Sequence, residues 1–182
     1  MTSIIKVDQI QTASGSAPTA ADLGINVAGT IITSKTFRIP VGASNLAISA
    51  NADVQWWNET FTTKRANSKI LITYHSGQIQ APSPPASGEV NARLGWSINS
   101  STLGANMELY RDHNHEWYRA ISSNTDLRFF VSGQALTNNV SAGTHTIYAH
   151  VGAYNSALTF GHQGTSGDGY RRAIITFQEI AG

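Results

Sequence analysis

The segment from Tyr170 to Gly182 constrains the fold most, because it has the pattern of a β-strand with apolar residues on both faces. Ala173, Ile175 and Phe177 lie on one face of this strand, and Ile174 and Ile180 lie on the other. A solvated antiparallel sheet needs only one apolar face, so two such faces favour a core on one side and another subunit on the other. We therefore expect a homo-oligomer, and the candidate interface residues are Ile174, Ile175, Phe177 and Ile180.

The composition bounds the class of protein. A chain of 182 residues suffices for one sizeable domain, and a charged fraction of 13% with 16 glycines suits a β-rich protein with many turns. The 12 lysines and arginines are scattered without a basic stripe, so we expect no nucleic-acid partner. Cysteine is absent, which excludes disulfides and thiolate metal sites. No apolar run approaches the roughly 20 residues of a membrane span. We therefore expect synthesis in the host cytoplasm, without insertion into a membrane.

Alternating apolar and polar residues predict about eight to ten strands and no long helix. The clearest half-buried strand runs from Val90 to Ile98, where every second residue is apolar. Further strands are predicted within Thr30–Ile39, Lys69–Ile79, Met107–Tyr110, Trp117–Ile121, Leu127–Leu136, His145–Tyr154 and Ala157–Phe160. Segments rich in Gly, Pro and Ser separate the strands, as in antiparallel sheets. The expected fold class is all-β, an antiparallel β-sandwich of the jelly-roll kind.

Two parts of the chain resemble known proteins. Ile4 to Thr12, followed by Pro18-Thr19 and Asp22 to Gly24, resembles the opening of tail-fibre and virion structural proteins of marine and cyanobacterial phages. Three further segments are similar to the C1q/TNF-like jelly-roll knobs of phage fibre proteins: Phe61–Ile72, Ala142–Thr146 and Ile174–Ile180. The resemblance implies a ten-stranded antiparallel sandwich packed around a threefold axis. It also implies a place in the virion.

The resemblance divides the chain into residues 1–29 as an N-terminal virion-attachment segment, 30–49 as a connecting strand region and 50–182 as the jelly-roll knob. The expected function is a trimeric short fibre or fibre knob that attaches the virion to a host surface, with other virion proteins as partners of the N-terminal segment. No collagen repeat or heptad stretch is present, so a fibre built from this chain would be short. A head fibre, a capsid decoration protein and a polysaccharide-degrading enzyme remain alternatives.

Three turn-rich segments are candidate ligand loops, namely Ala81–Gly88, Asp112–Trp117 and Gly161–Gly169, and a host glycan or protein is the expected ligand. The candidate ligand residues in them are His113, His115, Trp117, His162 and Asp168. The His113-Asn114-His115 spacing suits a divalent metal, but a solvated hairpin tip is the simpler interpretation. We expect no metal and no cofactor. We also expect no catalytic residue, because the chain has neither the length nor the repeat of polysaccharide-cutting β-helical spikes. Trp56-Trp57 is interpreted as core or interface packing rather than a sugar platform.

Overall fold

The computed structural model describes residues 28–39, 46–81, 88–107, 114–120, 127–154, 156–160 and 173–182. Every regular element in these ranges is a β-strand. The strands are β1 (Ile31–Arg38), β2 (Leu46–Ile48), β3 (Asp53–Thr63), β4 (Lys69–His75), β5 (Ile79–Ala81), β6 (Gly88–Ile98), β7 (Asn114–Ala120), β8 (Leu127–Phe129), β9 (Ser132–Leu136), β10 (Gly143–Tyr154), β11 (Leu158–Phe160) and β12 (Ile174–Ile180).

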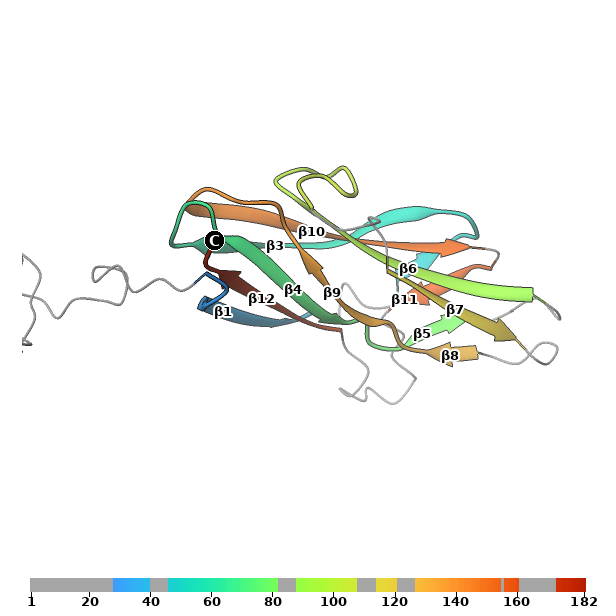
Figure 1. The fold of residues 1–182 in the computed structure, drawn as a ribbon. Helices are drawn as coiled ribbons and strands as arrows, with labels where there is room; N and C mark the ends of the chain where they lie inside the picture. Colours follow the sequence, from blue (N-terminus) through green and yellow to red (C-terminus); the bar gives the residue numbers. More distant parts are fainter. Residues whose placement is uncertain are drawn as a thin grey trace, which may run out of the picture.

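Two four-stranded antiparallel sheets form the body of the molecule (Figure 1). Their strand orders are β1-β12-β4-β9 and β3-β10-β6-β7. When the eight strands of these two sheets are numbered 1 to 8 along the chain, the order of the first sheet is 1-8-3-6 and that of the second is 2-7-4-5. Two interlocked Greek keys produce this order, so the sandwich is a jelly roll. The predicted fold class is confirmed. Since β1 pairs with β12, the sandwich begins at β1 and includes part of the region expected only to connect.

A small third sheet, β2-β11-β5-β8, continues the first sheet beyond a break. Each of its strands adjoins one strand of β1-β12-β4-β9 along the chain, in the same order. At the break, Ser76 and Val131 exchange hydrogen bonds: Ser76 N donates to Val131 O at 2.8 Å, and Val131 N donates to Ser76 Oγ at 2.9 Å. Gly77 follows with a φ of 69°. The predicted strands Lys69–Ile79 and Leu127–Leu136 are therefore each two strands.

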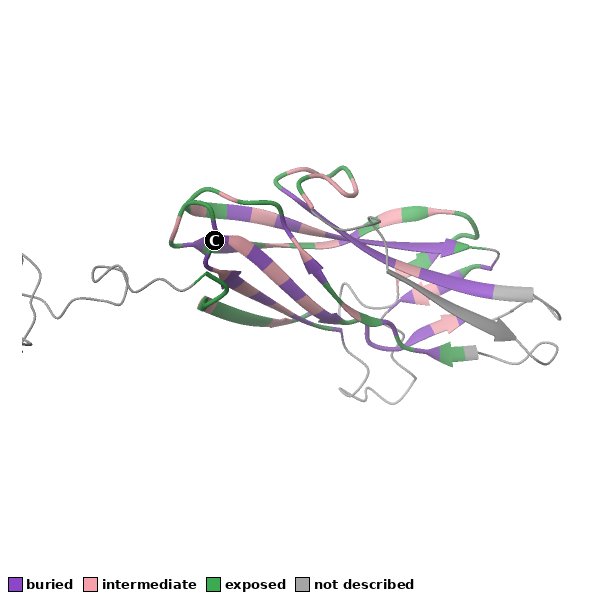
Figure 2. Cartoon of the chain, in the orientation of Figure 1, coloured by how far each residue is buried: buried purple, intermediate pink, exposed green. Residues whose placement is uncertain are grey.

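The core lies between the two large sheets. Buried and half-buried residues alternate along β4 and β12, as the purple and pink bands of Figure 2 show. Phe177 of β12 is fully buried, and its ring centroid lies 5.0 Å from that of Phe37 and 5.8 Å from that of Phe61. On β6, the inward residues from Val90 to Ile98 are buried as predicted. The outward Asn91 and Ser97 are buried too, whereas the outward Arg93 between them stays partly exposed.

A β-bulge in β3 turns two consecutive tryptophans into the core. Trp57 pairs with Ala149 and Gln55 pairs with His150, so Trp56 is the extra residue of β3. The Trp56 ring lies 5.9 Å from that of Phe160, and the Trp57 ring lies 5.7 Å from that of Phe37. Both rings pack with core residues, which confirms core packing for Trp56-Trp57.

The segments that resemble fibre knobs meet at one end of the sandwich. Glu179 of β12 is fully buried and accepts hydrogen bonds from Lys64 N, Arg65 N and Ser68 Oγ, at distances between 2.9 and 3.0 Å. His145 of β10 forms a hydrogen bond through Nε2 with Thr63 Oγ1, at the end of β3, at 3.2 Å. These contacts join the β3–β4 turn, the start of β10 and β12, so the residues of the resemblance here hold the fold together.

Candidate functional site

The outer face of the β1-β12-β4-β9 sheet, which we call the β12 face, follows from the alternation of each strand. Residues that pair in register share a face, so those between the buried positions line up across the four strands. The β12 face carries Ile31, Ser34, Thr36 and Arg38 of β1, Ile174, Thr176, Gln178 and Ile180 of β12, Lys69, Leu71, Thr73 and His75 of β4, and Ser132, Gln134 and Leu136 of β9.

The centre of the β12 face carries no charge. One middle row consists of Thr36, Thr176, Thr73 and Gln134, and the next consists of Ser34, Gln178, Leu71 and Leu136. Arg38, His75 and Lys69 are the ionisable side chains of this face within the described residues, and they lie in the end rows. Ile174 is 41% exposed and lies beside His75, whose ring centroid is 5.2 Å from that of the exposed Phe130. A neutral centre with exposed apolar groups suits a protein contact.

The four candidate interface residues divide between the two faces of β12. Ile175 and Phe177 are buried inside this chain's own sandwich, so they serve the core and do not reach the surface. Ile174 and Ile180 lie on the β12 face. The two apolar faces deduced for this strand are therefore present, and only the outer one is available to another subunit.

A second group of side chains lies on the outer face of the β3-β10-β6-β7 sheet. Asp53 of β3 and Arg93 of β6 both pair in register with Gly152 of β10. The Asp53 carboxylate occupies the space where a Cβ of Gly152 would lie, and Arg93 Nη1 is 3.3 Å from Asp53 Oδ2. The Arg93 guanidinium carbon lies 5.5 Å from the ring centroid of Tyr154. We call Asp53, Arg93, Gly152 and Tyr154 the Arg93 cluster.

Two of the predicted ligand residues lie next to this cluster. Asn114 to Trp117 belong to strand β7, which corrects the expectation of a loop from Asp112 to Trp117. The sequence from Asn114 to Trp117 is compatible with a loop or with a strand. Its pairing with β6 makes it a strand. His115 pairs with Arg93, and Trp117 pairs with Asn91.

The remaining predicted ligand residues, His113, His162 and Asp168, lie outside the described residues, as do residues 82–87, 112–113 and 161–169 of the predicted loops. The sequence reasoning missed Asp53, Arg93 and Tyr154, which are far apart in the chain and belong to no motif. Their only signal was the position of Arg93 among the outward residues of the strongly alternating strand from Val90 to Ile98.

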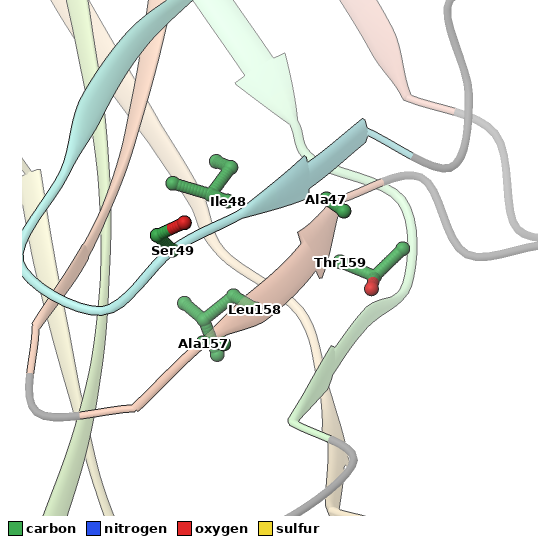
Figure 3. Close-up of a pocket in the computed structure, with 6 residues that line it drawn as sticks. All are labelled: Ala47, Ile48, Ser49, Ala157, Leu158 and Thr159. Atoms are coloured by element: carbon green, nitrogen blue, oxygen red, sulfur yellow. The ribbon is translucent and has the colours of Figure 1, made fainter.

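A shallow pocket of about 230 Å³ lies along β2 and β11 (Figure 3). Its lining consists of Ala47, Ile48 and Ser49 together with Ala157, Leu158 and Thr159. The lining side chains are small or aliphatic, with two hydroxyls and no ionisable group, so the pocket offers no acid, base or nucleophile pair. Within the described ranges, no three or more His, Asp or Glu side chains gather as metal ligands. The same ranges contain no helix long and apolar enough to cross a membrane.

Comparison with known proteins gives no family assignment. No family model and no curated protein matches the chain. Among solved structures, Eiger TNF from S. frugiperda overlaps 83% of this chain and 93% of its own, with a TM-score of 0.40 and 10% identity. Dimeric latent PorU from Porphyromonas gingivalis overlaps 95% of this chain and 14% of its own, with a TM-score of 0.33 and 9% identity.

A chain in the structure of infectious bursal disease virus Gx strain matches 84% of this chain over 39% of its own length, with a TM-score of 0.31 and 8% identity. The chain thus spans a small part of the PorU and viral chains and most of the Eiger chain. The assignment to the jelly-roll fold rests on the strand order of this molecule.

Proposed function

We propose that this chain is a non-enzymatic structural protein of a phage virion, a homotrimeric short fibre or fibre knob that contributes to attachment at the host surface. The observation that carries the proposal is the β12 face, whose centre is neutral and whose exposed residues include Ile174. Residues 1–29 are proposed to join the trimer to other virion proteins, because they resemble the opening of phage fibre proteins.

The chemistry of the β12 face favours a second copy of this chain as its partner. Burying an ionised side chain costs several kcal/mol unless it is paired, and the two middle rows of this face contain none. The hydroxyls of Thr36 and Thr176 bond to each other at 2.9 Å, so part of the polar content is already satisfied within the chain. The cationic Arg38 and Lys69 lie at opposite ends, where they stay hydrated at the rim of a contact.

Trimerisation gives such a protein its binding mechanism. A threefold assembly presents three copies of every surface site, and weak contacts to a repetitive host surface then add through avidity. The number three comes from the resemblance to C1q/TNF-like fibre knobs.

Matched threonine substitutions test the assembly. Thr176→Arg places a cation at the centre of the β12 face and should convert the trimer to monomers in multi-angle light scattering of the full chain. Thr144→Arg is the control, because Thr144 bonds to Thr62 at 2.9 Å on the opposite sheet, in the same kind of exposed Thr–Thr pair. Circular dichroism of both variants should match the parent. A monomeric parent protein, or a trimeric Thr176→Arg variant, contradicts the proposed interface.

The position on the particle separates the alternatives. Electron microscopy of virions with labelled antibodies should place the protein at the tail. Label spread over the capsid would instead identify a head fibre or decoration protein. Release of oligosaccharides from host surface polysaccharide by the purified trimer would contradict the non-enzymatic assignment.

A further inference from the structure

We infer that the Arg93 cluster on the outer face of the β3-β10-β6-β7 sheet is a binding site for a neutral pyranose sugar. The inference rests on the proposed attachment function, and it moves the expected ligand contact from the loops to a sheet surface. Three side chains on three adjacent strands carry it: Asp53 of β3, Tyr154 of β10 and Arg93 of β6.

The guanidinium of Arg93 is held in place but has hydrogen-bonding capacity left. It has five N–H donors, and within the described residues its hydrogen bond is the 3.3 Å contact from Nη1 to Asp53 Oδ2. Its Nε is buried and has no hydrogen-bond partner among the same residues, while the side chain as a whole is 25% exposed. The Tyr154 ring supports the guanidinium from one side at 5.5 Å. An arginine in this state offers the N–H groups of its exposed edge to acceptor atoms of a ligand.

Asp53 supplies the complementary acceptor. Its side chain is 40% exposed, and Arg93 is its one hydrogen-bond donor in the part of the chain that the structure describes. A sugar hydroxyl both donates and accepts, so neighbouring hydroxyls fit a carboxylate and a guanidinium that lie side by side. The two formal charges cancel, so a negatively charged ligand would gain little from Arg93 and would be repelled by Asp53. This balance favours a neutral sugar over an acidic one.

The aromatic contribution comes from Tyr154, which is 38% exposed at the end of β10. The apolar C–H groups of a pyranose pack against an aromatic ring, while the ring hydroxyls reach the polar groups beside it. All three residues lie on hydrogen-bonded strands, so their spacing is set before a ligand arrives and little ordering entropy is lost on binding.

The test uses the purified full chain and saturation-transfer NMR with the methyl glycosides of glucose, galactose, mannose and N-acetylglucosamine, with glucuronate as the acidic probe. We expect at least one neutral glycoside to bind with a dissociation constant on the order of millimolar. Tyr154→Ala and Arg93→Gln should each weaken that binding tenfold or more. Tyr148→Ala is the matched control, because Tyr148 lies on the outer side of the same strand, opposite Asn58 and Ser97, and should bind like the parent.

Three results would overturn the inference: no binding of any neutral glycoside, binding of glucuronate alone, or unchanged binding by both Tyr154→Ala and Arg93→Gln. Light scattering of the same samples separates this inference from the proposed assembly. A trimer that binds no sugar refutes the sugar site and leaves the assembly intact. A monomer that binds a glycoside through Arg93 and Tyr154 refutes the trimer and leaves the sugar site intact.

Discussion

Glu179 is a buried carboxylate whose hydrogen-bond partners carry no formal charge. Its two oxygens accept from Lys64 N, Arg65 N and Ser68 Oγ, all in the turn between β3 and β4. A carboxylate is an acceptor at both oxygens, so it satisfies two backbone N–H groups of a turn that no strand partner reaches. The residue therefore fixes the β3–β4 turn to the last strand.

Glu179→Gln should lower the free energy of unfolding by about 2 kcal/mol, because the Oε2 acceptor of Lys64 N becomes an NH₂ group even when the amide oxygen keeps the Oε1 position that accepts from Arg65 N. Urea denaturation followed by circular dichroism measures the change. Glu59→Gln is the control, since the Glu59 carboxylate accepts, within the described residues, only from the adjacent Thr60 N, and the substitution should change stability by less than about 0.5 kcal/mol. Equal effects of the two substitutions would refute this role of Glu179.

Phe177 and Ile174 lie three residues apart on opposite faces of β12. Phe177→Ala should cost about 3–5 kcal/mol of folding stability, since the ring is fully buried between the sheets. Phe177→Asp would bury an unpaired charge and should prevent folding.

Ile174→Ala should leave the stability of the folded chain within about 1 kcal/mol of the parent and should weaken self-association. Thermal unfolding and sedimentation at several concentrations measure the two effects separately, and a large loss of monomer stability in Ile174→Ala would contradict the assignment of faces.

Gly152 allows Asp53 to reach across β10 to Arg93. A Cβ at position 152 would overlap the Asp53 carboxylate and lie 3.3 Å from Ala52 O, so Gly152→Ala should displace Asp53 from Arg93. The chain should stay folded, because the displaced group is the end of a partly exposed side chain. We expect the NMR signal of the Arg93 guanidinium to shift and glycoside binding to fall tenfold or more. Unchanged signals would show that Asp53 does not hold Arg93.

At the level of elements, the sequence predicted best where the period-two alternation is unbroken. The strand from Val90 to Ile98 was placed on its correct core face because every second residue is apolar. Most of β3 was missed, since its bulge makes consecutive residues Trp56 and Trp57 face inward and so cancels the alternation. The break between β8 and β9 was missed because the apolar Phe130 and Val131 continue through it. The break between β4 and β5 was missed although Ser76-Gly77-Gln78 interrupts the apolar alternation there.

The Arg93 cluster was not predictable from local pattern. Asp53, Arg93 and Tyr154 come together only through the register of β3, β10 and β6, and register follows from the pairing of whole sheets. The neutral character of the β12 face was foreseeable on β12 itself, from Ile174 to Ile180. Its continuation across β1, β4 and β9 required knowledge of which strands are neighbours.

The break between the first and third sheets depends on Ser76. Ser76 Oγ accepts from Val131 N at 2.9 Å and donates to Gly77 O at 2.7 Å, and Ser76 is fully buried. Ser76→Ala should cost about 1–3 kcal/mol, because it removes the side-chain acceptor of the Val131 N–H. Hydrogen exchange should rise at Val131 and in β5 and β8 before it rises elsewhere. Ser132→Ala, at an exposed position of β9, should leave the exchange rates unchanged.

At the scale of the whole molecule, the two outer surfaces suit complementary roles. The β12 face and the Arg93 cluster belong to different sheets of the sandwich, so they look in opposite directions. A trimer that buries the β12 face leaves the exposed Asp53, Arg93 and Tyr154 accessible and displays the Arg93 cluster three times. The proposed assembly and the proposed sugar site are therefore compatible, and avidity would connect a weak single site to firm attachment.

The last prediction concerns the N-terminal segment. Deletion of Met1 to Gly24 should leave a folded trimer, because backbone pairing of the described N-terminal part begins at Gly29, whose N donates to Ala181 O at 2.9 Å. Deletion through Arg38 is the contrasting variant. It removes β1 and, with it, the contacts of the Phe37 ring with Phe177 and Trp57. The backbone of β12 then becomes an exposed sheet edge.

Light scattering and thermal unfolding should show that the shorter deletion resembles the parent and that the longer one is destabilised or aggregated. Phage carrying the shorter deletion should then assemble particles that lack this protein, detected by immunoblotting of purified virions. Its presence on those virions would refute the attachment role of residues 1–29, whereas aggregation of the shorter deletion would show that the segment belongs to the fold.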